Sequence, residues 1–131
     1  DRNEFSEEFP NIVSGVGSIR VYDKPVVVIV SQVTGSAAES FAAIMQNLPN
    51  VTIIGDTTFG GSGGSLKYLL PNGWVCNSSI MQNKLTNGTF IEGSGVTPSV
   101  TDVFEPDTDD FDFEKEDKAI LAAIRILDEL Q

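Results

Sequence analysis

The segment Thr34 to Glu39 contains a serine whose position in the sequence could support catalysis. It reads Thr-Gly-Ser-Ala-Ala-Glu and comes shortly after the apolar run Val26 to Val30, where a predicted strand passes into a predicted helix. A serine in such a turn exposes its hydroxyl at the end of the sheet, and the N–H of the next residue points into the same space. Ser36 could therefore act as a nucleophile, with the Ala37 N–H as an oxyanion donor.

A purely structural role for Ser36 competes with this interpretation. A Ser followed three residues later by a Glu is the pattern of a capping box, in which Ser36 would be the helix N-cap and Glu39 its partner. Because such caps are common and need no catalysis, the pattern alone favours the cap.

Composition limits the remaining chemistry. The 131 residues include 19 Asp and Glu, eight Lys and Arg, one Cys and no His, for a formal net charge of −11. This charge repels phosphate backbones, so we do not expect nucleic acid as a partner. One cysteine, Cys76, without histidines cannot form a structural zinc site. Without histidine, a general base must be a carboxylate, Lys or Tyr, or must come from another segment.

Two further patterns suggest ligand-binding sites, but neither has the required residues at the required positions. A calcium loop starting at Asp107 would need Gly at Asp112 and Glu at Lys118. The glycines Gly60 to Gly64 lack a following Gly-Lys-Ser, and a dinucleotide motif starting at Gly61 fails at its sixth position. We therefore expect no metal and no cofactor. The glycines predict a tight reversal where the backbone passes close to a neighbouring strand or a bound peptide.

The elements that must position these residues indicate the α/β class. The β-branched runs 26–30 and 51–54 predict strands, and the apolar spacing over 36–48 predicts a helix between them that ends before Pro49. This order makes a parallel βαβ crossover. Residues 66–70 and 74–79 flank Pro71-Asn72-Gly73 and predict a β-hairpin. Residues 90–91 and 96–100 are weaker strand candidates.

The rest of the chain completes a single domain. Residues 1–23 form an irregular lead-in to a core over 24–101, and residues 102–113 form an acidic linker. Residues 114–131 predict a C-terminal helix with one apolar face, which comprises Ile120, Ala123, Ile124, Leu127 and Leu130. The aromatic residues, Trp74 and Tyr68 among them, are expected to pack in the core or at sheet edges. No apolar run approaches the length of a membrane span.

Five segments follow one another in a characteristic order: Lys24 to Val30, Thr34 to Phe41, Ile54 to Gly61, Leu70 to Gly73 and Ile91 to Pro98. Together they resemble the C-terminal processing, or tail-specific, peptidase family. The resemblance implies the crotonase-like ββα architecture shared with the Clp peptidase. It also makes Ser36 the nucleophile, because the Glu of the family's Ser-Ala-Ser-Ala-Ser-Glu motif aligns with Glu39.

The resemblance breaks where members with a Ser–Lys dyad carry lysine, because this chain has Gly61 there. Lys67 lies in a predicted strand and is a poor substitute. The match is closer to the tricorn-like branch, in which a His activates the serine and a Glu, here Glu92, completes the polar network. Thr97-Pro98-Ser99 departs from the usual Pro-Asp, which leaves the placement of Glu92 in doubt.

The resemblance implies that the chain is the C-terminal part of the catalytic domain of a serine endopeptidase, inactive alone, with its His supplied by an upstream segment. Its partners would be peptides or unfolded proteins bound near Gly60 and Gly61, in an extracytoplasmic location, with an oligomer possible. The alternative is a non-catalytic ligand-binding or peptide-binding domain of the same fold, which Gly61 supports. An acyl-CoA enzyme is disfavoured by the acidic surface.

Overall fold

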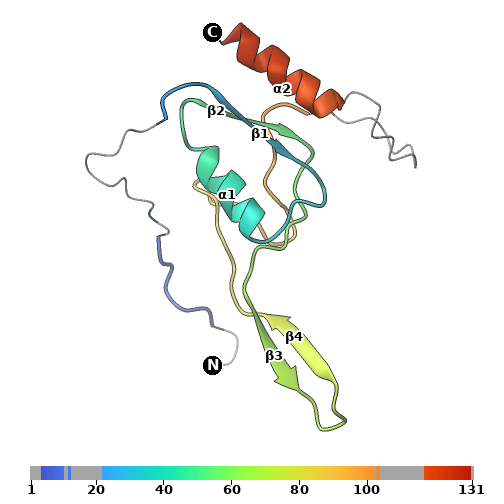
Figure 1. Ribbon diagram of the computed structural model, residues 1–131. Helices are drawn as coiled ribbons and strands as arrows, with labels where there is room; N and C mark the ends of the chain where they lie inside the picture. The colour runs from blue at the N-terminus through green and yellow to red at the C-terminus, as the bar shows by residue number, and fades with distance from the viewer. Residues whose placement is uncertain (1–3, 11, 13–21, 102, 104–116, 131) are drawn as a thin grey trace.

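The computed structural model describes residues 4–10, 12, 22–101, 103 and 117–130 (Figure 1). In chain order its elements are β1 Val26–Val30, α1 Ala37–Met45, β2 Val51–Gly55, β3 Ser65–Leu69, β4 Val75–Ser79 and α2 Lys118–Glu129. The predicted α/β class is confirmed. The acidic linker and the suggested calcium loop lie almost wholly outside the described residues, as does most of the lead-in.

The parallel βαβ crossover forms as predicted. β1 and β2 pair in parallel, from Val26 opposite Val51 to Val30 opposite Gly55. On the other side of β2, Ile54 forms a single parallel bridge with Val100. The prediction of strands at 90–91 and 96–100 is therefore wrong, because each segment contributes only one isolated bridge residue.

Both faces of the β1–β2 pair are covered, because successive strand side chains point to opposite faces. On one face Val30 and Ile53 pack with Ala42 of α1. On the other face Ile54 packs with Ala119 and Ala123 of α2, so the two helices lie on opposite sides of the strands (Figure 1). This sandwich fixes the end of β1, which leads into the turn that carries Ser36.

Helix α2 begins at Lys118, within the predicted range 114–131. The Asp117 carboxylate accepts hydrogen bonds from the N–H groups of Ala119 and Ile120, at 2.9 and 3.2 Å. The predicted apolar face is partly wrong. Ala123 of that face is buried against Ile54 together with Ala119, and Ile126 packs beside them, but Ile120 and Ile124 are 50% and 48% exposed.

The hairpin of β3 and β4 forms but projects from the body (Figure 1). Every residue of both strands is exposed. The expectation that Tyr68 and Trp74 pack in the core is wrong, because they are 49% and 72% exposed. Their side chains share one face of the hairpin with Leu66 and Leu70, and no other described element covers that face. Among the described residues, no helix is long and apolar enough to cross a membrane.

Candidate active site

Ser36 stands at the turn between β1 and α1 in a strained backbone conformation. It is the N-cap of α1, it is exposed, and its φ and ψ angles are 57° and −126°. In the described part of the chain it is the one residue other than glycine with a positive φ. Such a conformation costs about 1–3 kcal/mol and persists only where the surroundings enforce it. An ordinary N-cap serine is extended, so capping alone does not require this geometry.

Two acceptors hold the Ser36 backbone in place. Its backbone N–H donates to Glu39 Oε2 and to the carbonyl oxygen of Gly61, with nitrogen–oxygen distances of 3.1 and 3.2 Å. The first contact belongs to the capping box that the sequence predicts. The second joins the serine to a glycine loop 25 positions further along the chain, a contact that a local cap does not include.

The Glu39 side chain is fully buried and accepts four hydrogen bonds. Its Oε1 accepts from Thr58 Oγ1 and from the Gly60 N–H, both at 2.6 Å. Its Oε2 accepts from the Gly61 N–H at 2.9 Å, in addition to the Ser36 N–H. The side chain is 0% exposed, so one carboxylate beneath the turn holds both the serine and the glycine loop.

These contacts keep Glu39 ionised. Burial raises the pKa of a carboxyl group, but the hydrogen bonds from Thr58, Gly60, Gly61 and Ser36 outweigh burial and lower the Glu39 pKa below its ordinary value of 4.5. All four donors are neutral groups. Glu39 is therefore a fixed negative charge that holds backbone N–H groups, with no cation among its hydrogen-bond partners.

The glycine loop passes close to a second chain segment, as the sequence predicts. The Gly93 N–H donates to the Gly60 carbonyl at 2.8 Å. Gly60 has a φ of 82°, and a Cβ there would lie 3.1–3.2 Å from the backbone of Gly93 and Gly95. A side chain at position 60 is thus excluded both by the backbone conformation and by its neighbours.

Glu92 lies on the other side of this loop. Its Oε1 accepts from Ser62 Oγ and its Oε2 from the Asn83 N–H, both at 2.8 Å. Asn83 Nδ2 also donates to Ser62 Oγ at 2.8 Å, which closes a three-residue polar cluster. No hydrogen bond joins Glu92 to Ser36 among the described residues. The two polar groups are linked through the backbone of residues 60–62.

The remaining predicted site residues occupy separate places. Ala37 is exposed and is the first residue of α1, so its N–H has no acceptor within the helix. Lys67 is exposed on the projecting hairpin and makes no hydrogen bond to the residues around Ser36. In the part of the chain that the structure describes, no three Cys, Asp or Glu side chains gather closely enough to hold a metal ion.

Sequence reasoning missed Thr58, Ser62 and Asn83. The Thr58 hydroxyl donates to Glu39 and accepts from the Val96 N–H at 2.8 Å, so it links the serine turn to the segment that follows Glu92. A lone threonine, serine or asparagine carries no periodic signal. The capping-box pattern identified Glu39 as a local partner but gave no indication of its contacts with residues 58–61.

Comparisons with known proteins show which proteins this chain is similar to. The sequence profile of Peptidase family S41 matches residues 3–101. Carboxy-terminal processing protease CtpA of Bacillus subtilis (strain 168) is 33% identical over 81 residues, which cover 62% of this chain. A Parabacteroides merdae protein described as a peptidase superposes with a TM-score of 0.72 and 32% identity over 85% of this chain.

Mature CPAF has a similar structure, with a TM-score of 0.56 and 26% identity over 61% of this chain. In every case the relative is much longer. The chain spans 17% of CtpA, 34% of the Parabacteroides merdae protein and 16% of CPAF.

We expect the substitution Glu39→Gln to lower the free energy of unfolding by about 2–4 kcal/mol, because its amide group faces donors that then lack an acceptor. Urea unfolding of the 131-residue chain measures the change. The matched control is Glu129→Gln at the exposed end of α2, which should change stability by less than about 0.5 kcal/mol. Equal effects of the two substitutions would contradict the structural role of Glu39.

The same carboxylate predicts a pH dependence of stability. Because the folded-state pKa of Glu39 is lowered, the stabilisation it supplies is complete above the unfolded value and is lost as the pH falls through the folded value. The stability difference between the unsubstituted chain and Glu39→Gln should therefore shrink as the pH falls below about 4. Urea unfolding at a series of pH values tests this, and a difference that grows with acidification would refute it.

Proposed function

The chain belongs to Peptidase family S41, and from this premise we propose that the intact protein is a serine endopeptidase in which Ser36 is the nucleophile. The observation that carries the proposal is the conformation of Ser36. The residue is exposed, it has a positive φ at the start of a helix, and a buried carboxylate enforces that conformation. Strain of this kind, held in place by surrounding structure, is typical of functional residues.

The proposed reaction follows from the positions of the groups. A base removes the proton from Ser36 Oγ as the oxygen attacks the peptide carbonyl carbon, and the N–H of Ala37 stabilises the negative charge on the carbonyl oxygen. The protonated base then gives its proton to the leaving amine, which leaves an acyl-serine. The same base then removes a proton from water, whose oxygen attacks the ester carbon. The bond to Ser36 Oγ breaks, the base returns the proton to that oxygen, and the second product leaves as a carboxylic acid.

The base must come from outside these 131 residues if it is the histidine of the tricorn-like branch, because the chain contains no His. We propose that another segment of the intact protein supplies it. Glu92 is proposed to orient the polar network, and its contacts with Ser62 and Asn83 hold the carboxylate in place for that role. Glu39 is a positioning residue that acts through the backbone of Ser36.

The second candidate function is a non-catalytic peptide-binding domain of the same fold. The observation that favours it is Gly61, whose N–H donates to Glu39 at the position where dyad members carry lysine. This function needs a surface that binds a peptide but no base and no reactive serine. The extracytoplasmic location, the oligomer and the crotonase-like architecture stay predictions from the resemblance.

Replacing Ser36 with Ala in the intact protein should lower kcat for peptide hydrolysis by at least about 10³-fold, because the nucleophile is lost. The substitution removes only the hydroxyl, so the backbone hydrogen bonds of residue 36 can still form. Steady-state hydrolysis of an unstructured protein, followed by the appearance of new amino termini, measures the change.

The matched control is Ser78→Ala on the exposed hairpin strand β4, which should retain full activity. Unchanged hydrolysis by the folded Ser36→Ala protein would remove Ser36 from the mechanism. An intact protein that binds peptides but does not hydrolyse them would support the binding domain instead.

A further inference from the structure

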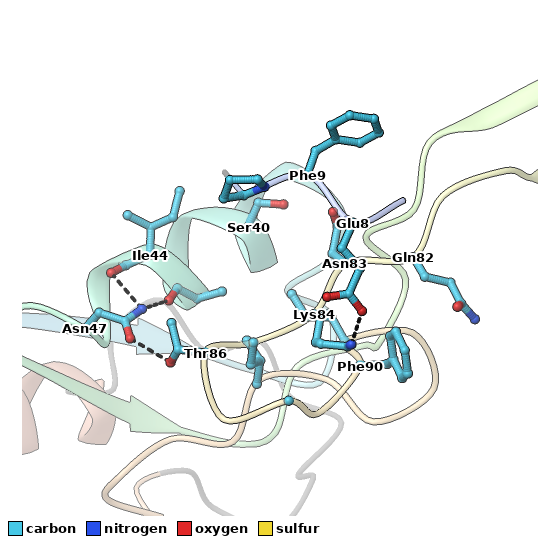
Figure 2. Close-up of a pocket in the computed structure, with 15 residues that line it drawn as sticks. Glu8, Phe9, Ser40, Ile44, Asn47, Gln82, Asn83, Lys84, Thr86 and Phe90 are labelled. Carbon is cyan, nitrogen blue, oxygen red and sulfur yellow. Dashed lines mark hydrogen bonds and ion pairs between the residues drawn. The ribbon is translucent and has the colours of Figure 1, made fainter. Parts of the chain in front are cut away.

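A groove of about 620 Å³ runs beside α1, and the mechanism above does not use it (Figure 2). The helix lines it with Ser40 and Ile44, and the segment 82–91 lines it with Leu85 and Phe90 among others. These walls combine apolar side chains with a few polar groups, which is the usual make-up of a ligand site. The volume suits a short length of extended chain.

One positive charge marks the groove. Apart from the groove residues contributed by the amino-terminal segment 8–10, Lys84 is the one charged residue in its lining. Its Nζ lies 5.0 Å from the centroid of the Phe90 ring, and its side chain is 35% exposed. The ring face favours an ammonium group at this position. In a chain with a net charge of −11, a cation at this position indicates an anionic ligand group.

The chain's own residues 8–10 form one wall of the groove, and Glu8 shows what kind of group Lys84 pairs with. Glu8 forms an ion pair with Lys84 across 76 positions of sequence. In Figure 2, Glu8 points toward Lys84 while the ring of Phe9 points the other way. Successive side chains of an extended peptide point to opposite sides in the same manner. The ion pair therefore indicates a ligand that presents an acidic side chain to the lysine in place of Glu8.

The groove adjoins both parts of the candidate active site. Ser40 lies in the first turn of α1, four positions after Ser36 in the sequence. Asn83 lines the other wall, and its N–H donates to Glu92. A peptide in the groove thus contacts the helix that begins directly after Ser36 and the residue that binds Glu92.

We propose that this groove binds an extended peptide substrate and that Lys84 selects an acidic side chain within it, in the position that Glu8 occupies when no substrate is bound. That the bound peptide is a substrate rests on the proposed peptidase function. The binding and its preference for an acidic side chain rest on the groove alone. An exposed ion pair gives modest discrimination, so the preference is expected to be a few-fold rather than absolute.

The test uses the full 131-residue chain and two fluorescein-labelled peptides. One has the sequence of residues 4–12, and the other is identical except that lysine replaces the glutamate equivalent to Glu8. Fluorescence anisotropy measures the two dissociation constants for the chain that carries Glu8→Gln, which removes the competing internal carboxylate. We expect this variant to bind the acidic peptide about threefold more tightly than the unsubstituted chain does.

The Glu8→Gln variant should also prefer the acidic peptide over the lysine peptide by about threefold or more, and adding Lys84→Glu should reverse that preference. The matched control is Lys67→Glu, the same change of charge on the hairpin, which should leave the preference unaltered. If circular dichroism shows that Lys84→Glu unfolds the chain, Lys84→Met keeps the aliphatic stem and should abolish the preference.

Any one of three results would overturn the proposal. The Glu8→Gln variant could bind the two peptides equally, it could show no saturable binding, or Lys67→Glu could change the peptide preference as much as Lys84→Glu does. These measurements need no hydrolysis and are made equally well with Ser36→Ala. If the preference for the acidic peptide is retained but the intact protein does not hydrolyse peptides, only the peptidase proposal is contradicted. If the two peptides bind equally but the intact protein hydrolyses peptides, only the groove proposal is contradicted.

Discussion

The buried Glu39 carboxylate links three segments that are separated in the sequence. It holds the N–H of Ser36, the N–H groups of the glycine loop, and the Thr58 hydroxyl that in turn binds the segment after Glu92. A carboxylate at 0% exposure is stable only because each of its oxygens accepts two hydrogen bonds. The strain at Ser36, the close approach of the glycines and the position of the helix end all depend on this interaction.

The architecture separates the rigid part of the site from the part that binds. Strands β1 and β2 and helix α1 fix Ser36 at the end of a buried sheet, where packing leaves little freedom. Glu92 and one wall of the groove come instead from the irregular segment 82–92, while α1 supplies the opposite wall. Such a division lets the segment change its side chains, and so its ligand, without disturbing the serine turn.

The sequence predicted the local features well and the non-local ones poorly. Strand β1, helix α1 and the hairpin all have strong periodic or turn signals, and each was found within a few residues of its predicted position. The turn allowed either a cap or a nucleophile at Ser36, and the resemblance is what made this residue the predicted nucleophile. Glu39 was identified only as a helix cap, since its contacts with residues 58–61 depend on how β2 leads back past the serine.

Two other differences have the same physical origin. Periodicity gave α2 an apolar face that includes Ile120 and Ala123, but packing against Ile54 uses Ala119, Ala123 and Ile126 and leaves Ile120 half exposed. Trp74 was expected to pack in the core or at a sheet edge because of its residue type, yet nothing in the sequence says which elements would cover the hairpin. Patterns along the chain identify which residues can pack, whereas the partner surface decides which of them do.

The most direct test is a crystal structure of the intact protein after reaction with a fluorophosphonate, which attaches to an activated serine hydroxyl. We predict a phosphorus atom bonded to Ser36 Oγ, a phosphonyl oxygen within hydrogen-bond distance of the Ala37 N–H, and a Glu39 carboxylate that still binds the N–H groups of residues 36, 60 and 61. An adduct on a different residue in a protein that hydrolyses peptides would contradict the account, as would a Ser36 hydroxyl that remains unmodified in such a protein.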